Sequence, residues 1–281
     1  MNARRWRRRL TSGGMTGLVA LLSFLAVLAL VLIVGNLVAK GASSLDVSFF
    51  VKNPVPAGES GGGVANAIVG TAIIVGLACL IGLPIGIGAG IYLAEYGSGK
   101  LGWTVRFVAD VLNGTPSIVI GIFAWTWIVK PVGHFSALAG GAALAILMIP
   151  MLARTTEEMV RLVPHSLREA ALALGYPRWR TSTNIIVRTA LSGIITGALV
   201  GVARVAGETA PLLFTALGNL NFSTSVAEPM QTLSLQIYVY ATGPFEDWHR
   251  MAWAAALVLM GLVLALSIAS RWATRSRHGA W

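Results

Sequence analysis

The feature that most constrains this chain is the alternation of long apolar blocks with short stretches that carry nearly all of the charge. A block of about 20 apolar residues can cross the hydrocarbon core of a bilayer as a helix, because each residue rises about 1.5 Å. A helix is favoured there because lipid offers no partners to free backbone N–H and C=O groups. Only 11% of the 281 residues are charged, against about 25% in soluble domains. The sequence therefore predicts an all-α integral membrane protein.

Six blocks are long enough to cross the membrane. We expect helices at about residues 17–38, 67–93, 105–129, 136–153, 189–217 and 251–270, joined by polar segments at 39–63, 95–104, 154–188 and 218–250. The Gly- and Pro-rich composition of segment 39–63 favours a loop. A basic N-terminus before an apolar stretch is also typical of a signal peptide. The first block is longer than such a stretch and no convincing cleavage site follows it, so we expect a retained helix.

The positive charges are distributed unevenly between the two sides of the predicted membrane. Of 21 Lys and Arg residues, 16 fall on the side of both termini and of segment 154–188, and Arg204 lies within the fifth block. The other side holds Lys40, Lys52, Lys130 and Arg250. Since cytoplasmic segments carry the excess of Lys and Arg, both termini are predicted to be cytoplasmic. The net charge of +10 is thus explained by lipid headgroups, and no nucleic-acid partner is expected.

Small residues and prolines recur inside the blocks. Glycines spaced four apart put small residues on one helix face, where a neighbouring helix can approach closely; they are Gly82, Gly86 and Gly90 in the second block, and Gly193, Gly197 and Gly201 in the fifth. We expect ordinary helix packing at both sets, with a moving interface as the alternative. Prolines remove a helix N–H and can kink a span; they are Pro84, Pro116 and Pro150.

Charged residues within the fifth block are the first candidate site. Arg204 and Glu208 lie four residues apart, so we expect them to pair along one helix face, with Thr209 adding a hydroxyl. A charge inside the bilayer is costly unless it is paired or hydrated. Two roles stay open: the pair only locks helix packing, or Arg204 lines an anion path and Glu208 holds it in place. A guanidinium suits an oxyanion because its planar fork can donate two parallel hydrogen bonds.

A second cluster lies at the cytoplasmic end of the fourth block. Arg154 and Glu158 have the spacing of a helix pair, and Glu157 and Arg161 are their neighbours. An interfacial ion pair and a gate near the cytoplasmic exit both fit this pattern. Asp110, near the start of the third block, is a weaker candidate that equally suits a helix end facing the interface.

The segment LREAALALGYPRWRTSTNIIVRT, from Leu167, predicts a short helix, a turn and a second helix. Ser166 is expected to cap the first helix and Glu169 to lie in its first turn. Gly175 is expected to end that helix in a left-handed conformation, and Pro177 to begin the next. From these features alone, a solvated connecting loop is an equally good interpretation.

This segment resembles the EAA loop of permease subunits of type I ABC importers, with matches at Glu169, Ala170, Ala171, Gly175 and Ile185. In that family the loop docks on the ATPase subunit and transmits its closure. Val187 is a mild change from the usual Leu, and Arg188 replaces the usual Pro, which puts the geometry of entry into the fifth helix in doubt.

Four further segments resemble the phosphate-specific (PstA-type) permeases, from about residue 61 onward: GGGVANAIVGT, GIYLAEYG, ADVLNGTPSIVIGIFA and ARVAGETAPLLFTALGN. The resemblance implies six helices in a MetI-like fold in a bacterial plasma membrane, and phosphate import along a path past Arg204, Glu208, Thr209 and Arg154. It also implies a homologous PstC-like permease, a PstB-like ATPase dimer that carries ATP and Mg, and a PstS-like binding protein. The domain division expected is 1–60 for the basic tail, first helix and outer loop, 61–272 for the permease domain and 273–281 for a cytoplasmic tail.

Several other functions lack support in the sequence. The string GSGK at residues 97–100 lacks the upstream glycine of a P-loop, so this chain is not expected to hydrolyse ATP or to carry a cofactor. Neither a metal-ligand cluster nor a catalytic constellation is visible, and the lone Cys79 is expected to pack as a small hydrophobe. An ion-coupled transporter or channel acting alone would show internal repeats and paired broken helices, and no convincing repeat is visible in the sequence. A permease for another oxyanion is the nearest alternative.

Overall fold

The computed structural model describes residues 3–56, 59 and 61–275, and their regular structure is helical apart from one isolated bridge between Leu217 and Met230. Five helical runs among these residues are long and apolar enough to cross a membrane, or six if one bent pair is a single span. The runs are residues 11–44, which include most of α1 (Ala3–Gly41), then α3 (Ala65–Glu95), α7 (Ala137–Arg161), residues 178–206, and residues 246–269 of α13 (Glu246–Arg275). The prediction of an all-α membrane protein is confirmed.

The third predicted span is not one helix. It is divided into α4 (Lys100–Gly114) and a second limb made of α5 (Ser117–Ala124), a π-helical turn (Trp125–Val129) and α6 (Lys130–Val132), and the two limbs meet at 106°. Pro116 has no N–H to donate, and it disfavours helical backbone at the residue before it. Thr115 is accordingly extended, with φ −77° and ψ 133°. The expectation of a continuous helix over 105–129 is therefore wrong, whereas Pro84 and Pro150 lie inside unbroken helices.

The glycines of α3 let this helix approach α7 closely. A Cβ on Gly86 would lie 2.7 Å from Cβ of Leu152, and one on Gly90 would lie 2.6 Å from the carbonyl oxygen of Ala153. Gly82 faces Met148 in the same way. The predicted close packing is confirmed, and α7 is the neighbour that requires it.

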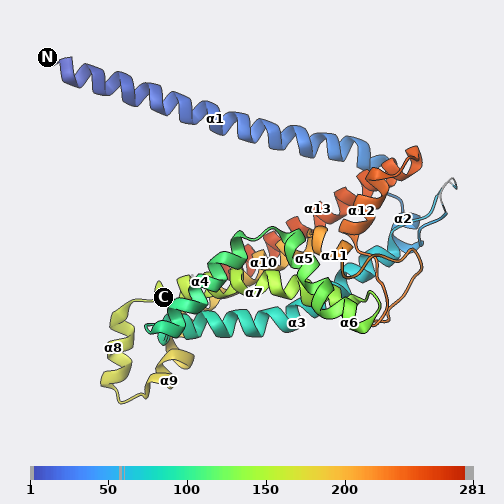
Figure 1. Ribbon diagram of the computed structural model, residues 1–281. Coiled ribbons are helices and arrows are strands. Elements are labelled where there is room, and N and C mark those ends of the chain that lie inside the picture. The colour runs from blue at the N-terminus through green and yellow to red at the C-terminus, as the bar shows by residue number, and fades with distance from the viewer. Residues whose placement is uncertain (1–2, 57–58, 60, 276–281) are drawn as a thin grey trace.

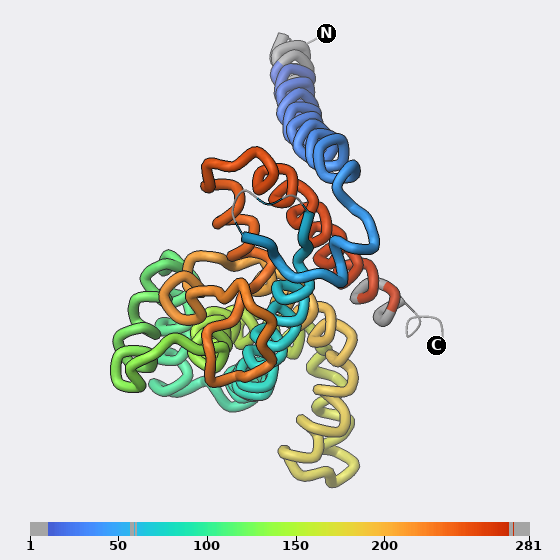
Figure 2. Tube along the Cα trace, turned by 90° about the vertical axis from the view of Figure 1, so that its right-hand side faces the viewer, coloured from blue at the N-terminus to red at the C-terminus, as the bar shows by residue number. Residues whose placement is uncertain are grey.

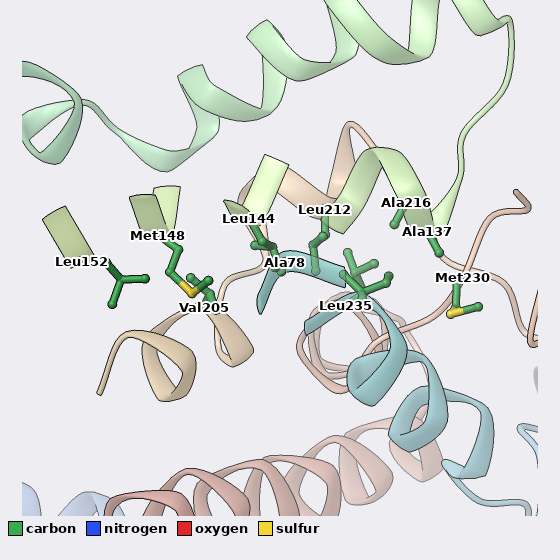
Figure 3. Close-up of a cluster of buried hydrophobic side chains, with 11 residues drawn as sticks. Ala78, Ala137, Leu144, Met148, Leu152, Val205, Leu212, Ala216, Met230 and Leu235 are labelled. Carbon is green, nitrogen blue, oxygen red and sulfur yellow. The ribbon is translucent and has the colours of Figure 1, made fainter. Parts of the chain in front are cut away.

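Helix α7 is the centre of the molecule. Gly193, Gly197 and Gly201 of α10 (Val187–Ala206) face Met159, Thr155 and Leu152 of α7 from a second side. Figure 3 shows the main core along α7, where buried side chains from α3, α7, α10 and the segment after it meet. The labelled members include Leu144, Met148, Leu152, Val205 and Leu212. Because α7 is buried on several sides, residues 137–153 of this helix are apolar on all faces.

The segment after α10 covers the start of α7. The backbone N–H groups of Ser136, Ala137 and Leu138 donate to the carbonyl oxygens of Thr215, Glu228 and Val226, at 2.9–3.0 Å. Helix N-termini leave such N–H groups without intrahelical partners, so this loop completes the helix. The segment holds α11 (Ala210–Leu213) and α12 (Leu233–Thr242).

Other connections are also more helical than predicted. Residues 39–63 contain a 3₁₀ turn (Ala42–Ser44) and α2 (Val47–Val51), and residues 154–161 continue α7. The structure of segment 218–250 likewise includes α12 and the first turn of α13. These helices are too short to form an apolar block that crosses the membrane, and their polar composition is also typical of loops. The sequence therefore predicted loops in these segments.

The described ends of the chain lie toward the same end of the molecule. In Figure 1 the start of α1 and the last described turn of α13 are on the left, with α8 (His165–Ala173) and α9 (Arg178–Arg180), whereas α2, α6 and α12 are on the right. Helix α1 contacts the rest of the chain near its end, where Gly41 packs against Trp253 and the Lys40 ammonium lies 4.9 Å from the Trp253 ring centre. Figure 2 shows the remainder of α1 standing away from the body. This arrangement agrees with the charge-based orientation, which stays a prediction.

Candidate functional site

A buried carboxylate gathers three arginines where α3, α4 and α7 meet. The Glu157 side chain is 2% exposed and accepts hydrogen bonds from Arg106 Nε at 2.7 Å, Arg154 Nη1 at 2.9 Å and Arg161 Nη2 at 2.7 Å. Arg106 also donates to the backbone oxygens of Leu93 and Gly97, at 2.7 Å each. The cluster therefore ties the end of α3 to α4 and α7.

The predicted pairing of Arg154 with Glu158 is wrong. Arg154 pairs with Glu157, three residues on, and its Nε lies 3.0 Å from Oδ1 of Asp110 in α4. Glu158 is exposed and makes no ion pair among the described residues. Spacings of three and four both bring helix side chains together, and the position of Arg106 on α4 favours Glu157. Asp110 is thus a mid-helix partner of Arg154 and not a residue of a helix end.

A second ion pair fastens α8 to the end of α3. Arg168 donates to Oε1 of Glu95 from Nη2 at 2.7 Å and from Nε at 3.2 Å, and the Ser182 hydroxyl donates to Oε2 of Glu95 at 2.8 Å. Arg168 also donates to the carbonyl oxygens of Val160, in the last turn of α7, and of Val163, just after α7. Three segments that are distant in sequence are therefore held at one carboxylate.

The helix–turn–helix predicted after Leu167 is present, with corrections to its start. Helix α8 begins at His165 after Pro164, so Ser166 lies inside the helix and does not cap it, and Glu169 lies beyond the first turn. Gly175 has φ +81° and ends the segment in the predicted left-handed conformation. Ala171 is buried, whereas Glu169 and Ala170 are exposed.

The entry into α10 is helical despite the unusual Arg188. Helix α9 continues through a π-helical segment (Thr181–Ile186) into α10, and Arg188 is exposed at the second residue of α10. The departure from proline therefore leaves the helix unbroken.

Large apolar side chains are exposed on the α8–α9 hairpin, residues 165–180. Leu174 is 79% exposed and Trp179 is 59% exposed, and Leu172 and Tyr176 are also open to solvent. Several exposed large apolar side chains on a segment that projects from the body are typical of a protein interface.

The predicted Arg204–Glu208 pair does not form. Helix α10 ends at Ala206, so Glu208 lies in the break before α11 and not on the face of Arg204. No ion pair joins these two side chains among the described residues. The Arg204 guanidinium is exposed, and its Nη1 lies 3.9 Å from Sδ of Met151 on α7. Glu208 and Thr209 are half-buried, and Thr209 is the residue immediately before α11.

A groove follows α7 and α10 from Met151 toward the α8–α9 end. Its volume is about 480 Å³. The lining residues are Met151, Thr155, Met159, Ser192, Gly193, Thr196, Gly197 and Val200. Because Arg204 contacts Met151, the exposed guanidinium stands at one end of this groove. Its lining is mostly apolar, with three hydroxyl groups.

Sequence reasoning missed a buried polar group beside the break after α10. Gln236 is fully buried, and its Oε1 accepts from Nε2 of Gln231 at 2.8 Å. The Thr71 hydroxyl oxygen accepts from the N–H of Leu233, and the Ser234 hydroxyl donates to the carbonyl oxygen of Glu208. These contacts tie α12 to α3 and to the break. The run QTLSLQ has no periodicity that would have singled it out.

Residues 86–278 match the family of binding-protein-dependent transport system inner membrane components. The chain belongs to this family. Curated relatives of this inner membrane component carry the name phosphate transport system permease protein PstA. The relative from Pasteurella multocida is 47% identical over 259 residues, which are 90% of this chain and 92% of that protein. The relative from Haemophilus influenzae is 44% identical over 271 residues, 96% of either chain.

Solved structures of ABC transporters share the fold of this inner membrane component. A chain of the MetNI methionine transporter in an inward-facing conformation has a TM-score of 0.59 at 20% identity, covering 76% of this chain and 93% of that one. A chain of a bacterial alginate transporter has a TM-score of 0.66 at 15% identity, covering 97% and 96%. The MetI-like fold predicted from the sequence is confirmed.

Proposed function

We propose that this chain is the membrane-spanning permease subunit of an ATP-driven importer of inorganic phosphate. The observation that carries the proposal is the identity of 44–47% with PstA proteins over most of the chain. The α8–α9 hairpin supports a role as a subunit that receives motion, because it projects from the body and exposes Leu174 and Trp179.

The work of the importer is divided among several chains in this proposal. A PstB-like ATPase dimer binds ATP and Mg and docks on the hairpin, with Glu169, Ala170, Ala171 and Gly175 at the contact. A homologous PstC-like permease completes the path across the bacterial plasma membrane. A PstS-like protein delivers phosphate on the outer side, and both termini of this chain are cytoplasmic. This chain has no ATP site and no cofactor of its own.

The substrate path runs past Arg204. Its guanidinium is exposed at the end of the groove between α7 and α10, and a planar fork suits a phosphate oxyanion. Glu208 and Thr209 line the break beyond α10, and Arg154 lies at the charged cluster nearer the hairpin. Closure of the ATPase moves the hairpin, and the core helices alternate between outward and inward openings. The difference in phosphate affinity between the two states supplies the coupling.

Uptake by the reconstituted complex tests the proposal. Vesicles containing both permeases and the ATPase, supplied with the binding protein, should accumulate labelled phosphate only when ATP is present on the hairpin side. Unlabelled phosphate should compete, and sulfate and molybdate should not. Accumulation of sulfate or molybdate in preference to phosphate would assign the chain to another oxyanion, and uptake without ATP would remove the importer class altogether.

A further inference from the structure

A cavity of about 560 Å³ lies at the base of the α8–α9 hairpin, between the hairpin and the end of α3. Its lining residues are Ala94, Glu95, Tyr96, Arg161, His165, Arg168, Leu172, Arg178, Thr181 and Ser182. The cavity shares no lining residue with the groove beside Arg204. Of the four exposed apolar side chains named on the hairpin, Leu172 lines the cavity, whereas the lining includes none of the residues proposed for the ATPase contact, Glu169, Ala170, Ala171 and Gly175.

The lining is strongly cationic. Three guanidinium groups face one carboxylate, that of Glu95, and His165 and Tyr96 complete the titratable groups. Glu95 is already neutralised, because it accepts from Arg168 and from the Ser182 hydroxyl. The remaining positive charge therefore has no compensating carboxylate in the cavity lining.

Two of the guanidinium groups have donors to spare. Arg161 uses Nη2 for Glu157, which it shares with two other arginines. Arg178 makes no ion pair among the described residues. Arg168, by contrast, is committed to Glu95 and to two backbone oxygens. Arg161 extends from the end of α7 and Arg178 from α9, so a ligand bound by both would bridge the body and the hairpin.

We propose that this cavity binds a multiply charged phosphate group between Arg161 and Arg178. Guanidinium forks match phosphate oxygens and bind them through charge-assisted hydrogen bonds. The group has two possible sources, inorganic phosphate on the hairpin side or the headgroup of an anionic phospholipid, for which the volume is sufficient. The inference rests on the proposed function only for the first source. A ligand that bridges the two elements restrains the hairpin relative to the body.

The test is hydrogen–deuterium exchange of residues 164–186 in the full transporter complex held in nanodiscs. One arm adds inorganic phosphate to nanodiscs of phosphatidylcholine, with chloride at equal ionic strength as the reference. The other arm replaces part of the phosphatidylcholine by phosphatidylglycerol without added phosphate. Exchange of the hairpin amides should slow in at least one arm, and the arm identifies the source.

Arg178→Gln and Arg161→Gln should each abolish this protection or raise the phosphate concentration that gives it by roughly tenfold or more, since each removes charge-assisted hydrogen bonds. The matched control is Arg180→Gln, which removes the same charge from the hairpin at a residue that does not line the cavity; it should keep the protection. Protection that is equal in all variants, or absent in both arms, overturns the inference. Transport of another oxyanion would overturn the proposed function and leave the lipid arm intact.

Discussion

At the scale of single residues, the charged groups of this chain act through neighbours that are distant in sequence. Glu157 is the clearest case, because its carboxylate holds arginines from α4 and α7, and Arg106 in turn holds the end of α3. The four-residue spacing of Arg154 and Glu158 indicated a different pair. The choice between Glu157 and Glu158 depends on Arg106, 51 residues earlier than Glu157, and no local rule contains that information.

Replacing Glu157 by Gln should destabilise the α3–α4–α7 junction. The change leaves three guanidinium groups around a neutral amide, and breaking a buried ion pair costs about 3–5 kcal/mol. Because the arginines are partly exposed, we expect about 1–3 kcal/mol, measured as a lower temperature of thermal unfolding in detergent. Glu158→Gln is the matched control and should leave that temperature unchanged; an equal loss in both variants would contradict the role assigned to Glu157.

Arg204 should matter for transport because of both its charge and its shape. Arg204→Gln should lower phosphate uptake by at least about tenfold, the size of one lost charge-assisted hydrogen bond. Arg204→Lys keeps the positive charge without the planar fork, so its rate of phosphate uptake should lie between those of the wild type and Arg204→Gln. Initial rates over a range of binding-protein concentrations measure the effect. The control Arg250→Gln removes a charge from an exposed pair with Asp247 and should transport normally; unimpaired uptake by Arg204→Gln would remove this residue from the path.

At the scale of elements, apolar length predicted the spans well because lipid burial depends on little else. It could not predict how the elements bend or dock. Pro116 signalled a kink, but the 106° turn also depends on the packing of α5 against α7 and α11. Helix α12 is too short for a span, and its burial comes from α3 and α13. The predicted pairing of Arg204 with Glu208 was wrong because apolar length did not show that α10 ends at Ala206. The sequence had predicted a helix that continues through residue 208.

The glycines of α3 give a prediction about packing. Gly86→Ala should destabilise the α3–α7 pair by about 1–3 kcal/mol, because overpacking forces neighbouring atoms to move and the new Cβ would lie 2.7 Å from Leu152 Cβ. Gly88→Ala is the matched control on the same helix, where a Cβ meets nothing within 4 Å. It should be neutral or slightly stabilising, since Ala favours a helix over Gly. The measurement is thermal unfolding, and equal stability of the two variants would show that α3 and α7 are not in such close contact.

Gly175 tests how far transport depends on the geometry of the hairpin. Its φ of +81° costs about 1–2 kcal/mol for residues with a Cβ, and Asn tolerates it better than Val does. Phosphate uptake per ATP hydrolysed should therefore decrease from wild type through Gly175→Asn to Gly175→Val. Gly99→Ala, in an open loop with ordinary φ, should match the wild type. Full coupling in Gly175→Val would mean that the turn does not position α8 for the ATPase.

At the scale of the whole molecule, two ends with different chemistry emerge. One end holds Glu157, Glu95 and their arginines, together with the projecting hairpin. The other holds the segment that covers the start of α7 and the buried Gln231–Gln236 pair. The charge count along the sequence predicts that the first end is cytoplasmic. The direction of import, and the side on which each partner docks, depend on this orientation.

Cysteine labelling in intact cells tests that orientation. In a Cys79→Ala background, which removes the lone native thiol, Ser98→Cys places a thiol in the exposed loop before α4, and Ser225→Cys places one in the exposed loop that covers α7. A membrane-impermeant maleimide should label residue 225 in intact cells and residue 98 only after permeabilisation. Both are exposed Ser-to-Cys changes, so each controls for the reactivity of the other. Labelling of residue 98 from outside would reverse the chain in the membrane, and the hairpin could then not receive a cytoplasmic ATPase.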